Sequence, residues 1–99
     1  MTASNDPVQV APHIYSVLFE NDRVRVLDVR MLPGAKSVLH THSNAVWYLL
    51  TPMRGRFSDG DGNASEVEFP TGVVWRDAEA HAVENRGNTE FRAVAIELK

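Results

Sequence analysis

Short runs of alternating apolar and polar residues, each ended by a turn, constrain this chain more than any other feature. In residues 23–31, Val24 and Val26 alternate with Arg25 and Leu27, close to the two-residue repeat of a β-strand. We expect strands at residues 8–10, 13–19, 23–31, 36–42, 45–51, 54–57, 65–69, 73–76, 82–85 and 91–98. No segment has the pattern of a long helix, so the chain is expected to be all-β, a sandwich or a barrel.

Glycine, proline and asparagine mark the turns between these strands. The pair Pro33-Gly34 suits a tight turn, because proline fixes φ and glycine accepts a positive φ. Residues 59–62, Asp-Gly-Asp-Gly, are a strong hairpin signal. They also resemble the opening of a calcium loop, but Ala64 and Pro70 stand where that loop needs glycine and glutamate. We therefore expect a hairpin here and no calcium site.

Composition restricts the class of protein. The 99 residues suffice for one domain, which we place at residues 8–99 after a flexible leader at residues 1–7. There is no cysteine, so disulfides, thiolate metal sites and cysteine nucleophiles are excluded. The net charge of -3 gives no basic surface for nucleic acid. No apolar run reaches the ~20 residues of a membrane span, and the polar N-terminus shows no signal peptide, so we expect a cytoplasmic protein.

Three of the four histidines could form a metal site. His40 and His42 are one residue apart, so in a strand both side chains point to the same face. His81 lies in a later strand-like segment and could complete a three-histidine site. Such a site suits a divalent Fe, Mn, Ni, Cu or Zn ion with coordination positions left open. The alternative is that these histidines have ordinary hydrogen-bond partners and no metal.

The order and spacing of the turns and histidines resemble the cupin superfamily. The first cupin motif is matched by Gly34, His40-Thr41-His42, Tyr48-Leu49-Leu50 and Gly55. The second motif is matched by Pro70-Thr71-Gly72, His81 and Asn85. The resemblance covers residues 23–98 and implies a conical antiparallel β-barrel (double-stranded β-helix, or jelly-roll) with ligands pointing inward. More narrowly, residues 20–27 and 81–85 resemble small cupins grouped with a β-alanine-degradation protein.

The chain departs from the cupin pattern at the fourth ligand. Ala45 stands where many cupins have a metal-binding glutamate, and residues 43–47 contain no carboxylate. The spacing of nine positions from Gly72 to His81 is also longer than usual. The resemblance then implies either a three-histidine site, as in the three-histidine thiol dioxygenases of the superfamily, or a site that has lost its metal. Glu79 is the nearest acid, either a ligand or acid/base or, in a loop, a solvated residue.

The strand pattern also suggests which residues line a pocket. If Ala45 faces inward, Trp47 and Leu49 do too, and Tyr48 faces outward. Trp75 is a second candidate for the pocket wall, or for the packed core. Arginines 54 and 56 could pair a substrate carboxylate, but we expect them to be solvated.

Three functions remain open at this stage. The first is a metalloenzyme, oxygenase-like in chemistry, that acts on a small polar molecule held beside His40, His42 and His81. The second is a metal-free cupin that binds or senses a small molecule without catalysis. The third is a structural dimer with a packed barrel. We expect a homodimer in each case, because sheet edges need cover, and we assign no catalytic residue, since Glu79 and Tyr48 are the only weak candidates.

Overall fold

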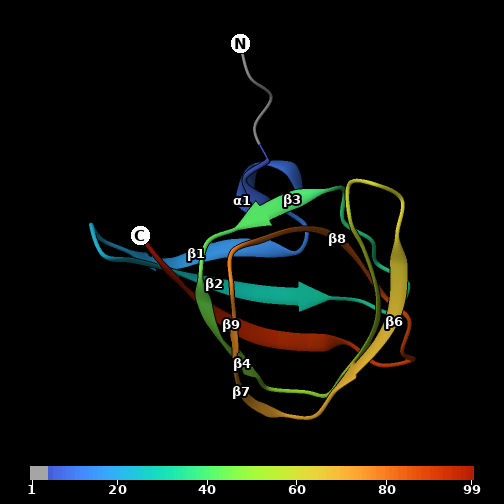
Figure 1. Cartoon of the computed structure of the whole chain (residues 1–99). Helices are drawn as coiled ribbons and strands as arrows, with labels where there is room; N and C mark the ends of the chain where they lie inside the picture. The colour runs from blue at the N-terminus through green and yellow to red at the C-terminus, as the bar shows by residue number, and fades with distance from the viewer. Residues whose placement is uncertain (1–4) are drawn as a thin grey trace.

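Two antiparallel sheets face each other and form a barrel (Figure 1). This computed structural model describes residues 5–99. Its elements are α1 (Pro7–Val10), β1 (Tyr15–Glu20), β2 (Val24–Met31), β3 (His40–His42), β4 (Ala45–Leu49), β5 (Met53–Ser58), β6 (Ala64–Phe69), β7 (Gly72–Arg76), β8 (Glu79–Asn85) and β9 (Phe91–Leu98). Among the residues described, the all-β class expected from the alternating pattern is confirmed.

The strands are not paired in the order of the sequence. One sheet has the order β1-β2-β9-β4-β7, and the other has the order β3-β8-β5-β6. β9, the last strand, therefore lies between β2 and β4, and β8 lies between β3 and β5. This exchange between early and late strands closes the jelly-roll and brings residues near position 40 next to residues near position 80.

The core lies between the two sheets. Along β9, Phe91, Ala93 and Ala95 point inward and are buried, while the residues between them are partly exposed. β2 contributes Leu27 and Met31 in the same way. The two-residue repeat of β9 also carries its last inward position, Glu97, into the interior, where it is 4% exposed. A buried carboxylate needs partners, and these lie in the candidate site.

Two expected strands differ from the structure. Residues 8–10 are part of α1, because Pro7 occupies the start of a helical turn and the Asp6 carbonyl accepts the amides of residues 9 and 10. The strand expected at residues 36–42 is confined to β3, since Lys36 makes only an isolated bridge to Glu84. Gly34 adopts a φ of +80° in the preceding turn, as the Pro-Gly pair predicts.

The β5–β6 hairpin forms where the Asp-Gly repeat predicts it. The Asp59 carboxylate accepts hydrogen bonds from the amides of Asp61 and Asn63, at 2.8 and 3.0 Å. Gly62 has a φ of +88°, which favours glycine at this position. The acidic side chain is therefore used to hold the turn.

The predicted leader is only partly described. Residues 1–4 of it lie outside the described part of the chain. Residues 5–7 pack on the barrel: the Asn5 carbonyl accepts the Thr41 amide at 2.8 Å, and Asp6 pairs with Arg25 at 2.6 Å. Over residues 5–99, no helix has the length and apolar character needed to cross a membrane.

Candidate metal centre

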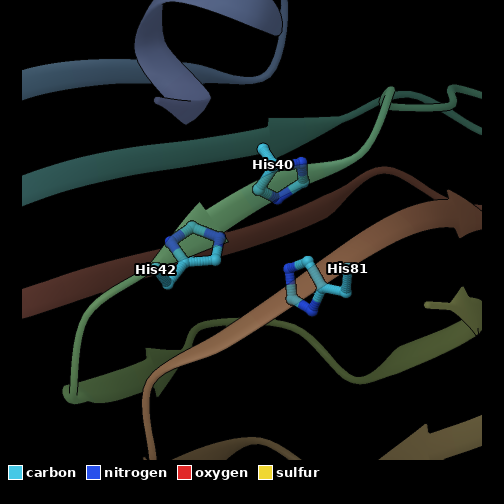
Figure 2. A group of neighbouring side chains, drawn as sticks. All are labelled: His40, His42 and His81. Carbon is cyan, nitrogen blue, oxygen red and sulfur yellow. The ribbon is translucent and has the colours of Figure 1, made fainter. Parts of the chain in front are cut away.

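β3 and β8 bring the three histidines together. His40 pairs directly with His81 across the two strands, and His42 lies on the same face of β3. The ring centroids are 4.7 to 5.0 Å apart, and Figure 2 shows the three rings turned toward one another. All three side chains are buried, at 0%, 4% and 5% exposed for His40, His42 and His81.

Each imidazole is held through Nδ1 by an oxygen that can only accept a hydrogen bond. His40 Nδ1 donates to the Val38 carbonyl at 2.9 Å. His42 Nδ1 donates to Glu97 Oε2 at 2.7 Å, and His81 Nδ1 donates to Glu79 Oε1 at 3.0 Å. Because carbonyl and carboxylate oxygens accept, the neutral form of each ring carries its proton on Nδ1. The lone pair of every ring is thus on Nε2.

The imidazole nitrogens that could bind a metal form a compact group. One ligand atom from each histidine lies within 4.8 Å of the other two. The Nε2 atoms of His42 and His81 are buried and have no hydrogen-bond partner in the described part of the chain. Buried polar atoms rarely stay unpaired, and Nε2 bonds of about 2.0–2.1 Å to one ion would satisfy both. The donor set therefore fits a divalent transition metal after a small closure of the rings.

His40 Nε2 is the exception, because it has a protein partner. The Tyr15 hydroxyl lies 3.0 Å from this nitrogen and is buried with it. Burial, with the charges of Glu97 and Glu79, raises the pKa of Tyr15 well above its usual range. The phenol is therefore neutral and donates its hydrogen to His40, so an ion on His40 Nε2 would have to displace this hydroxyl.

Two arginines hold the carboxylates that orient the histidines. Glu97 accepts from Arg25 Nε at 3.0 Å, and Arg25 also pairs with Asp6. Glu79 accepts from Arg76 at 2.5 and 2.7 Å. Burial alone would raise the pKa of Glu79, but the hydrogen bonds from Arg76 and His81 lower it to about 2. The pKa of Glu97 is also lowered, by its bonds to His42 and Arg25 against the effect of burial.

Burial favours the neutral form of His40 and His81. It lowers the pKa of His40 to about 4, and it lowers the pKa of His81 below its ordinary value. The neighbouring imidazoles lower both values further, since one positive ring disfavours another. Neutral imidazole is the form that binds metals, so near pH 7 no proton has to leave these two rings.

The structure places most of the expected pocket residues on the inner face of β4. Ala45, Trp47 and Leu49 are buried, and the Trp47 ring lies 5.1 Å from the His42 ring. Tyr48 faces outward and is 51% exposed.

The interpretation of Trp75 as pocket wall or core is wrong. Trp75 is 52% exposed, and its indole donates to the Asp77 carboxylate at 2.8 Å. Its neighbours Val74 and Arg76 point inward instead and line the inner cavity. The pairing of Trp75 with Val46 of β4 decides which residues of β7 face inward.

Of the alternatives considered for Glu79, the structure rules out a solvated loop residue. It is the first residue of β8 and pairs with His42, so its carboxylate reaches His81 and Arg76. The arginines at 54 and 56 are exposed as expected, each 3.8 Å from a glutamate of β6. Asn85 is buried and donates to the carbonyls of Met31 and Thr89, so it holds a turn and lies outside the histidine group.

Sequence reasoning missed Tyr15 and Glu97. Ala45 stands where many cupins have a metal-binding glutamate, and Glu97 of β9 pairs with Ala45 of β4. The neighbouring strand therefore supplies a carboxylate beside this position. Its carboxylate contacts Nδ1 of His42, and so it orients an imidazole that could bind a metal. Phe91, Ala93 and Ala95 alternate along β9, and extending this two-residue repeat predicts that Glu97 also points inward. No sequence pattern around Tyr15 predicts its contact with His40.

Two spaces lie near the histidines, and His81 lines one of them. An inner cavity of about 40 Å³ lies between the sheets, with Trp47, Phe57, Val83 and Arg76 among its walls. An open cleft of about 350 Å³ reaches His81 from the β5–β6 side, past Phe57 and Arg76. The Phe57 ring contacts His81 at 5.1 Å and belongs to both spaces. The open cleft therefore ends at His81, while the Nε2 atoms of His42 and His81 stay buried.

Comparisons with known proteins agree with this architecture. No protein-family model matches the chain, and no curated protein does. A crystal structure of a cupin domain from Bordetella pertussis Tohama I is 30% identical, with a TM-score of 0.78 over 87% of this chain and 92% of that one.

Two further solved structures show the same fold at lower identity. A Klebsiella pneumoniae protein with a double-stranded β-helix domain is 20% identical, with a TM-score of 0.67 over 86% of this chain and 75% of that one. A Thermotoga maritima protein described as a predicted oxalate decarboxylase is 25% identical, with a TM-score of 0.58 over 86% and 79%. The fold and the inward histidines define a small β-barrel with three buried histidines that could hold a metal ion. The chain belongs to the cupin superfamily.

Proposed function

We propose that this chain is a metal-dependent cupin that acts on a small polar metabolite. His40, His42 and His81 would hold one divalent Fe, Mn, Ni, Cu or Zn ion through Nε2. The single observation that carries the proposal is the orientation of the rings: all three Nδ1 atoms are bonded to acceptors, and two buried Nε2 atoms have no partner within residues 5–99. Ordinary core histidines would instead be satisfied at both nitrogens.

The surrounding residues prepare the rings for this role. Glu97 and Glu79 fix the tautomers of His42 and His81, and Arg25 and Arg76 keep both acids ionised and in place. Outer partners of this kind raise the basicity of a ligating imidazole. When bound, a metal with three nitrogen ligands and open positions polarises a substrate oxygen or supports oxygenase-like chemistry. The neutral Tyr15 hydroxyl is the nearest group able to donate a proton beside His40.

The substrate class follows from access and size. The open cleft and the small inner cavity suit a metabolite of a few non-hydrogen atoms. The similar Thermotoga maritima protein is described as a predicted oxalate decarboxylase, so the activity named there is one on a small carboxylate. We assign no pathway from the sequence likeness to cupins grouped with a β-alanine-degradation protein.

One observation favours the alternative, a metal-free cupin that binds or senses a small molecule. The Tyr15 hydroxyl already satisfies His40 Nε2, and Ala45 supplies no fourth ligand. In this case the open Nε2 atoms of His42 and His81 would accept hydrogen bonds from the ligand.

Metal analysis separates the two proposals. Untagged protein is purified, stripped with a chelator, reconstituted in turn with Fe²⁺, Mn²⁺, Ni²⁺, Cu²⁺ and Zn²⁺, and analysed by plasma mass spectrometry. We expect close to one ion per chain for at least one metal, and a loss of binding of tenfold or more in His81→Gln. The matched control is His13→Gln, because His13 is exposed and lies outside the cluster. Binding of no ion, or equal binding by both variants, would reject the metal site and leave the metal-free alternative.

A further inference from the structure

The indole N–H of Trp47 is a buried donor without a partner in the described part of the chain. The side chain is 7% exposed, on the inner face of β4, and its ring meets His42 edge to face at 5.1 Å. A buried tryptophan N–H normally finds an acceptor, because leaving it unpaired costs about 1–3 kcal/mol. Trp47 is one of the residues that line the inner cavity, so a molecule bound there could supply the acceptor that its indole N–H lacks.

The rest of the cavity wall offers little that is polar. Most of the lining is aliphatic or aromatic, from residues such as Val29, Leu49, Phe69 and Val83. Two other polar side chains line it, and both are engaged: the Tyr15 hydroxyl bonds to His40, and Arg76 pairs with Glu79 through two nitrogens. The cavity therefore combines an apolar wall with one free donor.

We propose that the inner cavity binds the apolar part of a small ligand with one polar head, such as a carboxylate, that accepts a hydrogen bond from Trp47. Trp47 is then a specificity-determining residue, because a second charged group would have to enter an apolar wall with no free cation among the lining residues. This inference deepens the proposed function, since it places the ligand head on the side of the cavity where Trp47 meets His42.

The size of the cavity limits the ligand. A water molecule needs roughly 10–15 Å³ by this measure, so the cavity of about 40 Å³ has room for a two- or three-carbon chain. Propionate is a suitable probe, with one carboxylate head and a two-carbon tail. Malonate has the same number of carbons but ends in a second carboxylate, so the pair tests the apolar wall directly.

The test follows the Trp47 indole resonance by two-dimensional ¹H–¹⁵N NMR. Trp75→Phe removes the other, exposed tryptophan and leaves Trp47 as the single indole signal. Propionate is titrated into metal-free and zinc-loaded protein, with malonate as comparison. We expect propionate to shift the resonance to saturation and malonate to bind at least tenfold more weakly. Equal shifts with both acids, or none with either in both forms, would overturn the inference.

Two further variants separate the contribution of the Trp47 hydrogen bond from that of the cavity volume. Trp47→Phe keeps an aromatic ring and removes the donor, and we expect propionate to bind about threefold to tenfold more weakly by calorimetry. Val83→Ile narrows the cavity without changing a polar atom, and we expect it to weaken propionate binding as well. If Trp47→Phe fails to fold, Val83→Ile carries the test, and unchanged binding in that variant would refute the cavity as the site.

The outcomes for metal and ligand are independent. Zinc binding at one ion per chain with no propionate response would leave the proposed function standing and reject this inference. A propionate response without any metal binding would support this inference and reject the metal site of the proposed function.

Discussion

At the scale of single residues, Tyr15 decides how ready His40 is to bind an ion. Its hydroxyl donates to His40 Nε2 at 3.0 Å, the nitrogen that a metal would need. We expect Tyr15→Phe to bind Zn²⁺ about twofold to tenfold more tightly, because no hydrogen bond has to be broken. The metal-free variant should also be less stable, by about 1 kcal/mol, since a buried nitrogen loses its partner. Competition against a colorimetric chelator and urea unfolding measure the two effects.

The opposite result would be equally informative. Weaker zinc binding in Tyr15→Phe would show that the phenol supports the bound ion directly. The control is Tyr48→Phe, which removes a hydroxyl from an outward, exposed side chain of β4 and should change neither quantity.

The buried histidines also predict how stability depends on pH. The pKa of His40 is lowered to about 4 in the folded protein, and that of His81 is lowered too, whereas both titrate near 6.5 when unfolded. Between pH 6.5 and 4 the unfolded chain therefore binds protons that the folded chain does not, so stability falls as the pH falls. We expect the unfolding free energy of metal-free protein to drop by roughly 1–3 kcal/mol over this range.

Urea unfolding at pH 7.5, 6, 5 and 4 measures this dependence. His40→Gln should flatten the slope above pH 5. A stability that does not change between pH 7.5 and 5 would contradict the prediction. The lowered pKa of Glu79, about 2, adds a further loss only as the pH falls below about 4.5.

At the scale of elements, the site depends on how closely β5 and β8 pack. Gly55 pairs with Asn85 in β8 and with Val67 in β6. A Cβ there would lie 2.5 Å from Met53 Cε and 3.0 Å from the Glu84 carbonyl oxygen. The methionine can move, but the backbone oxygen is held in the sheet, so we expect Gly55→Ala to cost about 1–3 kcal/mol. Gly60→Ala is the control, because its nearest neighbour would be Leu39 at an ordinary 3.5 Å.

The urea midpoints of the two variants provide the measurement. A Gly55→Ala protein as stable as Gly60→Ala would show that β8 can shift away from β5. Since β8 carries His81, such a shift should also appear as altered metal or ligand affinity.

The elements show which features the sequence could predict. The two-residue repeat and the turn residues were enough for the strand class and for the common face of His40 and His42. That His40 lies opposite His81 depends on the register of β3 against β8, which the whole sheet sets and no local pattern contains. Trp75 was misplaced for the same reason, because its phase depends on the pairing of β7 with β4. Residues 8–10 were misread because a proline-initiated turn can carry the same apolar residues as a strand.

At the scale of the whole molecule, the outer face of the five-stranded sheet is unusually apolar. The register places Phe19, Val26, Ile96, Val46 and Trp75 in one row across all five strands. Val94, Tyr48 and Val73 form a second row beside it. Phe19, Tyr48, Val73 and Trp75 are each more than half exposed, at 54%, 51%, 67% and 52%. An exposed apolar patch of this extent usually marks an interaction surface.

We propose that a second copy of the chain covers these two rows. The nearest charges on the face, Asp28 and Arg92, pair with each other at 3.4 Å, so two identical faces can meet without an unpaired charge. Five strands span roughly 19 Å at a spacing of about 4.8 Å, which gives an interface at the low end of those in stable dimers. We therefore expect a dimer that dissociates in the micromolar range.

Sedimentation at a series of concentrations tests this expectation. Trp75→Glu places a charge at the β7 end of the apolar row, next to Val46, and should give a monomer at all concentrations up to about 100 µM. Val38→Glu is the matched control, since Val38 is 58% exposed but precedes β3 of the opposite sheet. A wild-type monomer at high concentration would reject the dimer. A dimer unaffected by Trp75→Glu would show that the interface is not on this face. Because the histidines point into the barrel from the other sheet, metal and propionate binding should be the same in the monomeric variant.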